Sequence, residues 1–123
     1  MEFDELSRRV IGCALAVHRH LGPGLLESVY EQCLAHELTL EKIGFKIQAP
    51  LPVHYKSVRL ECGFRLDFMV ENDLILELKT VEELKGIHEA QLLTYMRLAG
   101  INKGLLINFN VQRLKDGIRR RVI

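Results

Sequence analysis

Apolar residues recur at helical spacing over the first 42 positions of the chain. One stripe predicts a helix over residues 4–20 and is formed by Leu6, Val10, Ala14, Val17 and Leu21. The segment LGPG, residues 21–24, ends this helix because glycine and proline interrupt helical structure. A second stripe predicts a helix that begins near Gly24 or Leu25 and ends near Lys42; its members are Leu26, Val29, Tyr30, Cys33, Leu34 and Leu38.

The pattern changes after Gly44 to one that is typical of strands. Residues 45–80 are rich in β-branched and aromatic residues, and Pro50 and Pro52 interrupt them, so about three or four antiparallel strands are predicted. The segment ENDL, residues 71–74, is expected to form the turn between the last two of these strands.

The last forty residues combine one more helix with two strands. A third helix is predicted from about Ile87 to Leu98, where Gly100 closes it. The segment KGLLINFN, residues 103–110, is nearly continuously apolar, which indicates a strand buried on both faces. A turn at Asp116 and Gly117 then leads to a final edge strand. The order α-α-β-β-β-α-β-β predicts helices packed around a mixed sheet, in an α/β or α+β arrangement.

Composition and charge limit the class of protein. The chain has 123 residues, 48% of them hydrophobic and 27% charged, which predicts one folded domain over residues 1–123 and leaves a homodimer open. The net charge is +1, so any surface that binds anions must be local. No apolar run approaches the roughly 20 residues of a membrane span, and the N-terminus is not typical of a signal peptide. Cys13, Cys33 and Cys62 predict free buried thiols in a cytoplasmic protein rather than a zinc site.

Two carboxylates and an ammonium interrupt the last two predicted strands of residues 45–80. Side chains alternate along a strand, so Asp67 shares a face with Arg65 and Met69, opposite Leu66, Phe68 and Val70. Glu77 and Lys79 likewise share a face, and the turn brings that face beside Asp67. Two neighbouring carboxylates repel each other unless a cation or proton lies between them, and Mg²⁺ prefers such oxygen ligands. With Lys79 to bind phosphate or hold a water, this set suits metal-assisted phosphodiester hydrolysis.

Each of these features has a simpler alternative. Acid–base pairs on a solvated hairpin are commonly surface pairs. Glu27, in the first turn of the second helix, is favourable there through the helix dipole alone. Gln91 and Tyr95 lie one turn apart, with His88 one turn before, and such residues also form the polar edge of an amphipathic helix.

Three segments, taken together and in this order, resemble the bacterial GxxExxY proteins of the PD-(D/E)xK nuclease superfamily. They are GLLESVY at residues 24–30, FRLDFMVENDLILELK at residues 64–79 and HEAQLLTYMRLAGINKGLLINFN at residues 88–110. The resemblance extends from about Leu6 to the C-terminus. It implies an α/β fold in which a restriction-endonuclease-like mixed β-sheet is flanked by α-helices. One departure is that Leu66, not proline, precedes Asp67.

The resemblance also implies roles for the matching residues. Asp67 and Glu77 match carboxylates that bind Mg²⁺ or Mn²⁺, and the carbonyl of Leu78 is a further candidate ligand. Glu27 matches an acidic residue that supports the metal directly or through water. Lys79 matches the lysine that orients the attacking water. Asp67, Glu77, Lys79 and Glu27 thus form the implied catalytic set, to which the third helix adds one more residue.

That further residue is Gln91, which with Tyr95 matches a Q-x-x-x-Y pattern that positions the site strand or contacts the phosphate backbone. Arg119 and Arg121 share a strand face and are candidates for binding nucleic acid, whereas charge on an edge strand also prevents aggregation. A wider basic patch is expected from Lys85, Arg97, Lys103, Arg113, Lys115 and Arg120. Because only 7% of residues are aromatic and there is no tryptophan, contacts to the phosphate backbone are expected rather than base stacking.

Three functions compete on these observations. The first is a metal-dependent nuclease, for which DNA is favoured over RNA as the partner. The second is a non-catalytic nucleic-acid-binding or assembly module that keeps the nuclease fold. The third is a structural or dimerising protein whose acidic residues are incidental. The first function predicts metal-dependent cutting, the second predicts salt-sensitive binding without cutting, and the third predicts neither.

Overall fold

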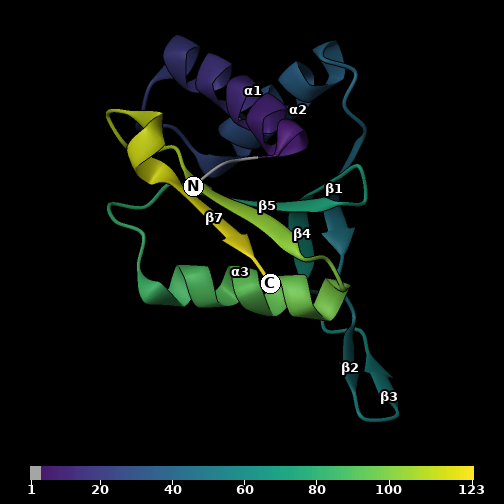
Figure 1. The fold of residues 1–123 in the computed structure, drawn as a ribbon. Coiled ribbons are helices and arrows are strands. Elements are labelled where there is room, and N and C mark those ends of the chain that lie inside the picture. Colours follow the sequence, from purple (N-terminus) through teal and green to yellow (C-terminus); the bar gives the residue numbers. More distant parts are fainter. Residues whose placement is uncertain (1–3) are drawn as a thin grey trace.

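The computed structural model describes residues 4–123, in which helices cover both faces of a central sheet. Helices α1 and α2 lie on one face and α3 lies on the other, and Figure 1 shows these three layers. In chain order the elements are α1 (Glu5–Leu21), α2 (Glu27–Leu40), β1 (Phe45–Pro50), β2 (Val53–Tyr55), β3 (Val58–Leu60), β4 (Arg65–Val70), β5 (Leu74–Lys79), α3 (Gly86–Ala99), β6 (Lys103–Asn108), the 3₁₀ helix η1 (Leu114–Gly117) and β7 (Ile118–Val122).

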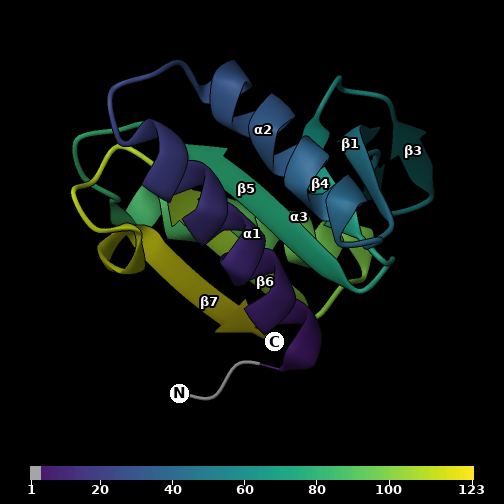
Figure 2. The ribbon, with the colours of Figure 1, turned by 90° about the horizontal axis from the view of Figure 1, so that it is seen from above.

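The main sheet has the strand order β1-β4-β5-β6-β7. Strands β5 and β6 are parallel, with α3 as their crossover, and the other neighbouring pairs are antiparallel. Seen from above, α1 and α2 run alongside β5, one on each side of it (Figure 2). The expected α/β fold, with a mixed sheet flanked by helices, is therefore confirmed, as is the edge position of β7.

Apolar cores on both faces of the sheet explain why β5 and β6 are buried so completely. On the side of α1 and α2, Leu76, Leu78 and Ile107 join residues of both helices. On the side of α3, Ile75 and Leu106 join Leu92 and Met96 of that helix. A strand buried on both faces needs apolar residues at nearly every position, which makes a buried carboxylate in β5 exceptional.

The turn between β4 and β5 forms where the sequence predicts it. Glu71 and Asn72 both have positive φ, 53° each, and the Asp73 amide donates to the Val70 carbonyl at 2.9 Å. Two successive positive φ angles are typical of the hairpin turns whose twist matches that of the strands.

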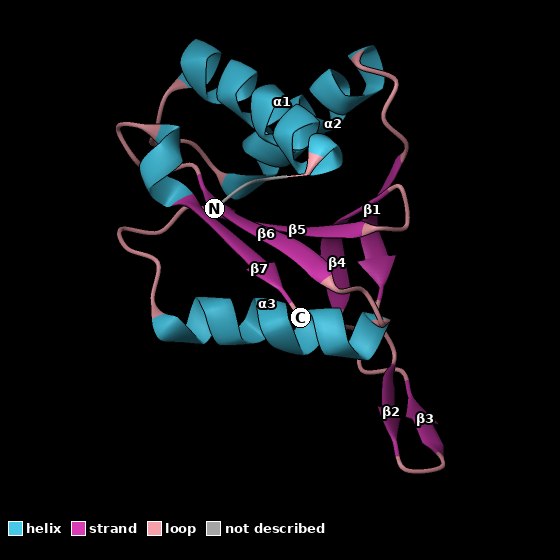
Figure 3. Cartoon of the chain, in the orientation of Figure 1, coloured by secondary structure: helices cyan, strands magenta, loops and turns pink. Residues whose placement is uncertain are grey.

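Several expectations were wrong in detail. Five strands precede α3, not three or four, because residues 53–60 form a separate small hairpin, β2–β3. This hairpin projects beyond α3, as Figure 3 shows. Helix α2 is shorter than predicted, Glu27–Leu40, because the chain before it is held in a turn in which Gly24 has φ 99°. Of the free cysteines only Cys13 is buried; Cys33 is half-buried and Cys62 is exposed.

No helix among residues 4–123 is long and apolar enough to cross a membrane.

Candidate active site

The β4–β5 hairpin opens at the two positions where the sequence places carboxylates. The strands are paired from Val70↔Leu74 to Phe68↔Leu76, and the pairing ends there. Beyond this point side chains take the place of backbone carbonyls. The Asp67 amide donates to Glu77 Oε2 at 2.8 Å, and the Leu78 amide donates to Asp67 Oδ2, also at 2.8 Å. The two carboxylates thus satisfy backbone donors that the opened ladder would otherwise leave unpaired.

A break in side-chain alternation accompanies this opening. Leu66 packs in the core beneath α3, whereas Phe68 packs in the core beneath α1 and α2. The prediction that these two residues share a face was therefore wrong. Strand β4 also pairs with β1. There the pairs on either side of Gln48 and Asp67 stay in register, while Gln48 itself has φ 51°. The backbone distortion is centred on Asp67 and on the residue opposite it.

Glu27 is placed by the turn that precedes α2. Tyr30 is fully buried and stacks on Phe109, with ring centroids 4.6 Å apart. Its hydroxyl donates to the Gly22 carbonyl at 2.6 Å and accepts from the Leu25 amide at 3.2 Å. Tyr30 therefore fixes the turn through which the chain enters α2, and Glu27 is the first residue of that helix.

Burial and repulsion from neighbouring acids perturb the carboxylates of Glu77, Asp67 and Glu27. Glu77 is only 5% exposed; burial first, and the charge of Asp67 second, raise its pKa from 4.5 to about 8. Burial also raises the pKa of Asp67, against the hydrogen bond from the Leu78 amide. The pKa of Glu27 is raised by burial and then by the charge of Asp67. Lys79 opposes the shift in each case, but it does not balance three acids.

Lys79 is held from the side of α3. Its Nζ donates to Gln91 Oε1 at 3.4 Å, and Gln91 Nε2 donates to the Tyr95 hydroxyl at 3.2 Å. Burial raises the pKa of Tyr95, and the charges of Glu77 and Asp67 raise it further, which places this helix face beside the carboxylates. Six of the seven residues expected from β4, β5, α2 and α3, all except Leu78, are thus linked by side-chain hydrogen bonds or electrostatic coupling.

The donor set fits a hard divalent cation. All candidate ligands are oxygens, and burial raises the pKa values of Asp67, Glu77 and Glu27, so a bound cation would stabilise their charged forms. Among residues 4–123, however, no three His, Cys, Asp or Glu side chains are arranged as a ready-made metal cluster. In the conformation described, one oxygen each of Asp67 and Glu77 is engaged with the backbone.

The basic residues are more closely paired than the sequence suggests. Arg121 Nη2 forms an ion pair with Glu89 of α3, and Arg119 donates to the carbonyls of Asp116 and Ile118. Lys103 Nζ lies 2.7 Å from Asp4 Oδ2 and 2.6 Å from Asp73 Oδ2. Lys103 is therefore part of an ion-pair network at the start of α1, which does not support its place in a basic patch.

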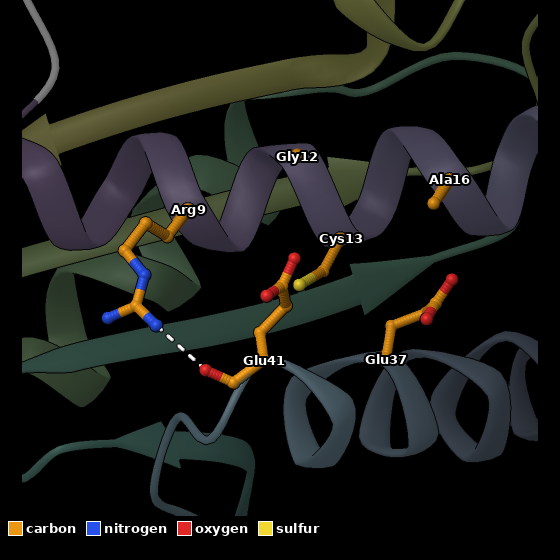
Figure 4. Close-up of a pocket in the computed structure, with 6 residues that line it drawn as sticks. All are labelled: Arg9, Gly12, Cys13, Ala16, Glu37 and Glu41. Atoms are coloured by element: carbon orange, nitrogen blue, oxygen red, sulfur yellow. Dashed lines mark hydrogen bonds between the residues drawn. The ribbon is translucent and has the colours of Figure 1, made fainter.

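A polar pocket lies between α1 and α2. It shares no residue with the acidic group, which is formed by Asp67, Glu77 and Glu27. Figure 4 shows Cys13 of α1 facing the side chains of Glu37, in α2, and Glu41, which caps α2, with Arg9 one turn earlier in α1. Burial, followed by the charges of Glu41 and Glu37, raises the pKa of the Cys13 thiol to about 11. A thiol in that state is a poor nucleophile, so this pocket does not offer cysteine chemistry.

Sequence reasoning missed two polar residues near Asp67. Gln48 Nε2 donates to both carboxylate oxygens of Glu31, at 3.1 and 3.3 Å, and a Gln48 side-chain hydrogen bond lowers the pKa of Asp67. Glu31 follows Glu27 by one helical turn, a spacing that puts both on one helix face and could have been read from the sequence. Gln48 gave no such signal, because one glutamine in a strand is ordinary.

Comparison with known families adds one finding. The sequence model of the PD-(D/E)XK nuclease superfamily matches residues 4–121. The chain belongs to this superfamily. Searches of curated proteins and of solved structures each found no match. Members of the superfamily generally use divalent metal ions and act on nucleic acids, so the opened hairpin lies in a fold associated with nuclease activity.

Proposed function

We propose that this PD-(D/E)XK protein is a metal-dependent nuclease that hydrolyses phosphodiester bonds, with DNA favoured over RNA. The observation that carries the proposal is the group of Asp67, Glu77 and Glu27, all with raised pKa values, at the open end of β4–β5. Burying several carboxylates with too little positive charge costs free energy, and groups with pKa values perturbed in this way are concentrated at functional sites. We further propose that residues 1–123 act as one nuclease-like domain.

Asp67 and Glu77, with the Leu78 carbonyl and Glu27, would hold Mg²⁺ or Mn²⁺. Such an ion lowers the pKa of a bound water and neutralises charge on the phosphate. Lys79 would keep the attacking water or a phosphate oxygen in place, because its ammonium is restrained by Gln91. Tyr95 would restrain Gln91 in turn. Arg119 and Arg121 remain proposed contacts to the phosphate backbone.

Within the superfamily we propose that the chain belongs to the bacterial GxxExxY proteins. The support is local: Gly24 adopts a positive φ, Glu27 begins α2 and belongs to the acidic group, and Tyr30 holds the turn that precedes α2. Each motif position therefore has a distinct physical role. A cytoplasmic location and a homodimer remain predictions from the sequence.

The test is a cleavage assay on labelled single-stranded, double-stranded and RNA oligonucleotides with Mg²⁺, with Mn²⁺ and with EDTA. We expect metal-dependent cutting by the wild type and none by Asp67→Ala or Lys79→Ala. Equal cutting by wild type and Asp67→Ala would contradict the assignment.

A second candidate is a binding or assembly module without catalysis. It is favoured by one observation, the use of Asp67 and Glu77 oxygens as acceptors for backbone amides. Salt-sensitive binding of nucleic acid by the wild type, without cutting under any metal condition, would select this candidate over the nuclease.

A further inference from the structure

The β2–β3 hairpin stands apart from the main sheet. Its strands pair only with each other, through Val53↔Leu60, His54↔Arg59 and Tyr55↔Val58. It extends away from the rest of the molecule, past α3 (Figure 1). Two-stranded hairpins are at best marginally stable in water, so a projecting one is expected to have a use that offsets its cost.

The two faces of this hairpin differ in chemistry. The pairing puts Val53, Tyr55, Val58 and Leu60 on one face and His54 and Arg59 on the other. Tyr55 is 60% exposed, and Val58 and Leu60 are exposed beside it. Between Val53 and Leu60 there is no carboxylate, while Lys56 and Arg59 are both cationic. The hairpin is therefore a positively charged strip with one apolar, partly aromatic face.

The exposed Tyr and Phe rings lie in the hairpin and in the segment that follows it. Among the Phe and Tyr residues of positions 4–123, only Tyr55 and Phe64 are exposed. The Lys56 ammonium lies 5.4 Å from the Tyr55 ring centroid. The low aromatic content of the whole chain argued against base stacking, but the exposed Tyr and Phe side chains lie in the hairpin and in the segment that joins it to β4.

The base of the hairpin is connected to the acidic group. Phe64 follows the hairpin, and its ring centroid lies 6.2 Å from that of Tyr95. Tyr95 accepts the hydrogen bond from Gln91, which in turn holds Lys79. A strand that lies along the hairpin from Tyr55 to Phe64 is thus led toward the side chains proposed for catalysis.

We propose that the β2–β3 hairpin is an arm that binds single-stranded nucleic acid, with unpaired bases on Tyr55 and Phe64 and phosphates near Lys56 and Arg59. The inference rests on the proposed function and names its substrate as a strand with unpaired bases. Stacking on an aromatic ring requires bases that are free of a duplex. Arg59 is paired with Glu61, but both side chains are more than half exposed, and such a surface pair yields readily to phosphate.

A second copy of the chain fits this face less well. The apolar face consists of four side chains, whereas a stable interface buries about 800 Å² on each partner. Cations at the hairpin tip repel the same cations of a second copy, but they attract phosphate. Charge and continuity with the acidic group therefore both favour nucleic acid.

The test is fluorescence anisotropy in EDTA, where nothing is cut, with a labelled single strand of thymidines and a blunt duplex of equal length. We expect Tyr55→Leu to weaken single-strand binding about 5- to 100-fold, because stacking is lost while apolar area is kept. Tyr55→Phe should bind as the wild type does. Val58→Ala is the matched control on the same face and should change binding less than about twofold.

Three results would contradict the proposal that the β2–β3 hairpin binds single-stranded nucleic acid. One is unchanged single-strand binding by Tyr55→Leu when the wild type binds, which leaves the nuclease proposal intact. Another is equal weakening by Tyr55→Leu and Val58→Ala, together with a wild-type dimer in light scattering that both variants dissociate, which would assign the face to a second copy. The last is a wild type that binds neither probe, which would remove the arm, while the cleavage assay with Mg²⁺ or Mn²⁺ decides separately whether the proposed function stands.

Discussion

The two ends of the β4–β5 hairpin have opposite chemistry. At the turn end, Val70↔Leu74 and Phe68↔Leu76 remain paired, and their side chains lie in the core beneath α1 and α2. At the open end, Asp67 and Glu77 leave the ladder, and their carboxylates bond to backbone amides. One strand pair thus provides stability at one end and a cluster of perturbed acids at the other. The difference shows that the paired, apolar end of the hairpin stabilises the fold, whereas the free-energy cost of burying the acids is confined to the open end.

The largest expected effect is at the open end. Lys79→Ala should lower metal-dependent cutting by about 10²- to 10⁴-fold, the usual contribution of a group that manages the attacking water. Its melting temperature should change little, because Lys79 is half-buried and its contact to Gln91 is long, 3.4 Å. Initial rates beside thermal melts measure both quantities. A matched control is Lys42→Ala, an exposed lysine after α2, which should cut normally.

The paired end should respond in the opposite way. Phe68→Ala removes a fully buried ring and should lower the free energy of unfolding by about 3–5 kcal/mol. Urea denaturation measures that loss. Cutting per folded molecule, measured well below the urea midpoint, should stay near that of the wild type. A loss of cutting as large as that of Lys79→Ala, in protein that is still folded, would break the separation between the two ends.

The pH dependence of stability should distinguish the two ends of the hairpin further, because Glu77 at the open end changes its protonation state. Its pKa in the folded protein is about 8, against 4.5 ordinarily, so the folded state binds the proton more tightly than the unfolded state. The stability this contributes is fully present below pH 4.5 and is lost as pH rises through 8. Glu77→Gln keeps an acceptor for the Asp67 amide and lacks the charge. In EDTA it should gain stability over wild type by a few kcal/mol as pH approaches 8, at about 1.4 kcal/mol per pKa unit.

Urea titrations of both proteins at several pH values measure this difference. Asp67 and Glu27, whose pKa values are also raised, should give the variant a weaker slope of the same sign. If the free energy of unfolding varied with pH in the same way in wild type and Glu77→Gln, Glu77 would not be the acid with the strongly raised pKa. Removal of metal should matter most at high pH, where all three acids are ionised.

The smallest effect is expected at the turn before α2. Tyr30→Phe removes the bonds to the Gly22 carbonyl and the Leu25 amide and should cost about 1 kcal/mol. Stacking on Phe109 is retained, so the protein should fold. Because Glu27 is placed by this turn, cutting should fall several-fold, and more metal should be needed for half-maximal rate. Phe45, a half-buried aromatic far from this turn, offers a control as Phe45→Leu.

Much of the fold could be predicted because local patterns and tertiary structure agree. The stripes of α1, the turn at residues 71–73 and the apolar run of β6 each lie where periodicity places them. The β2–β3 hairpin could not be predicted, because Val53, Tyr55 and Val58 have strand-like character wherever they pair. Only the tertiary arrangement decides that they pair with each other outside the main sheet.

The site was predictable by residue type more than by geometry. Asp67, Glu77 and Lys79 are conspicuous as charges inside apolar strands. Strict alternation, however, misplaced Leu66, because the carboxylates open the ladder and the backbone twists at that point. A pattern of period two cannot report a distortion that depends on side chains bonding to the backbone. The same limit hid Gln48, whose positive φ becomes meaningful only opposite Asp67.

The central claim is that the open end of β4–β5 gathers carboxylates for a divalent cation, and thermal melting in a Mg²⁺ titration at pH 8 tests it most directly. The proteins to compare are the wild type and the Asp67→Asn/Glu77→Gln double variant. We expect the wild type to have the lower melting temperature in EDTA. Millimolar Mg²⁺ should raise that temperature by about 5 °C or more, because the ion binds only the folded state. The double variant should start higher and not respond. Equal responses of the two proteins, or none in either, would contradict the account.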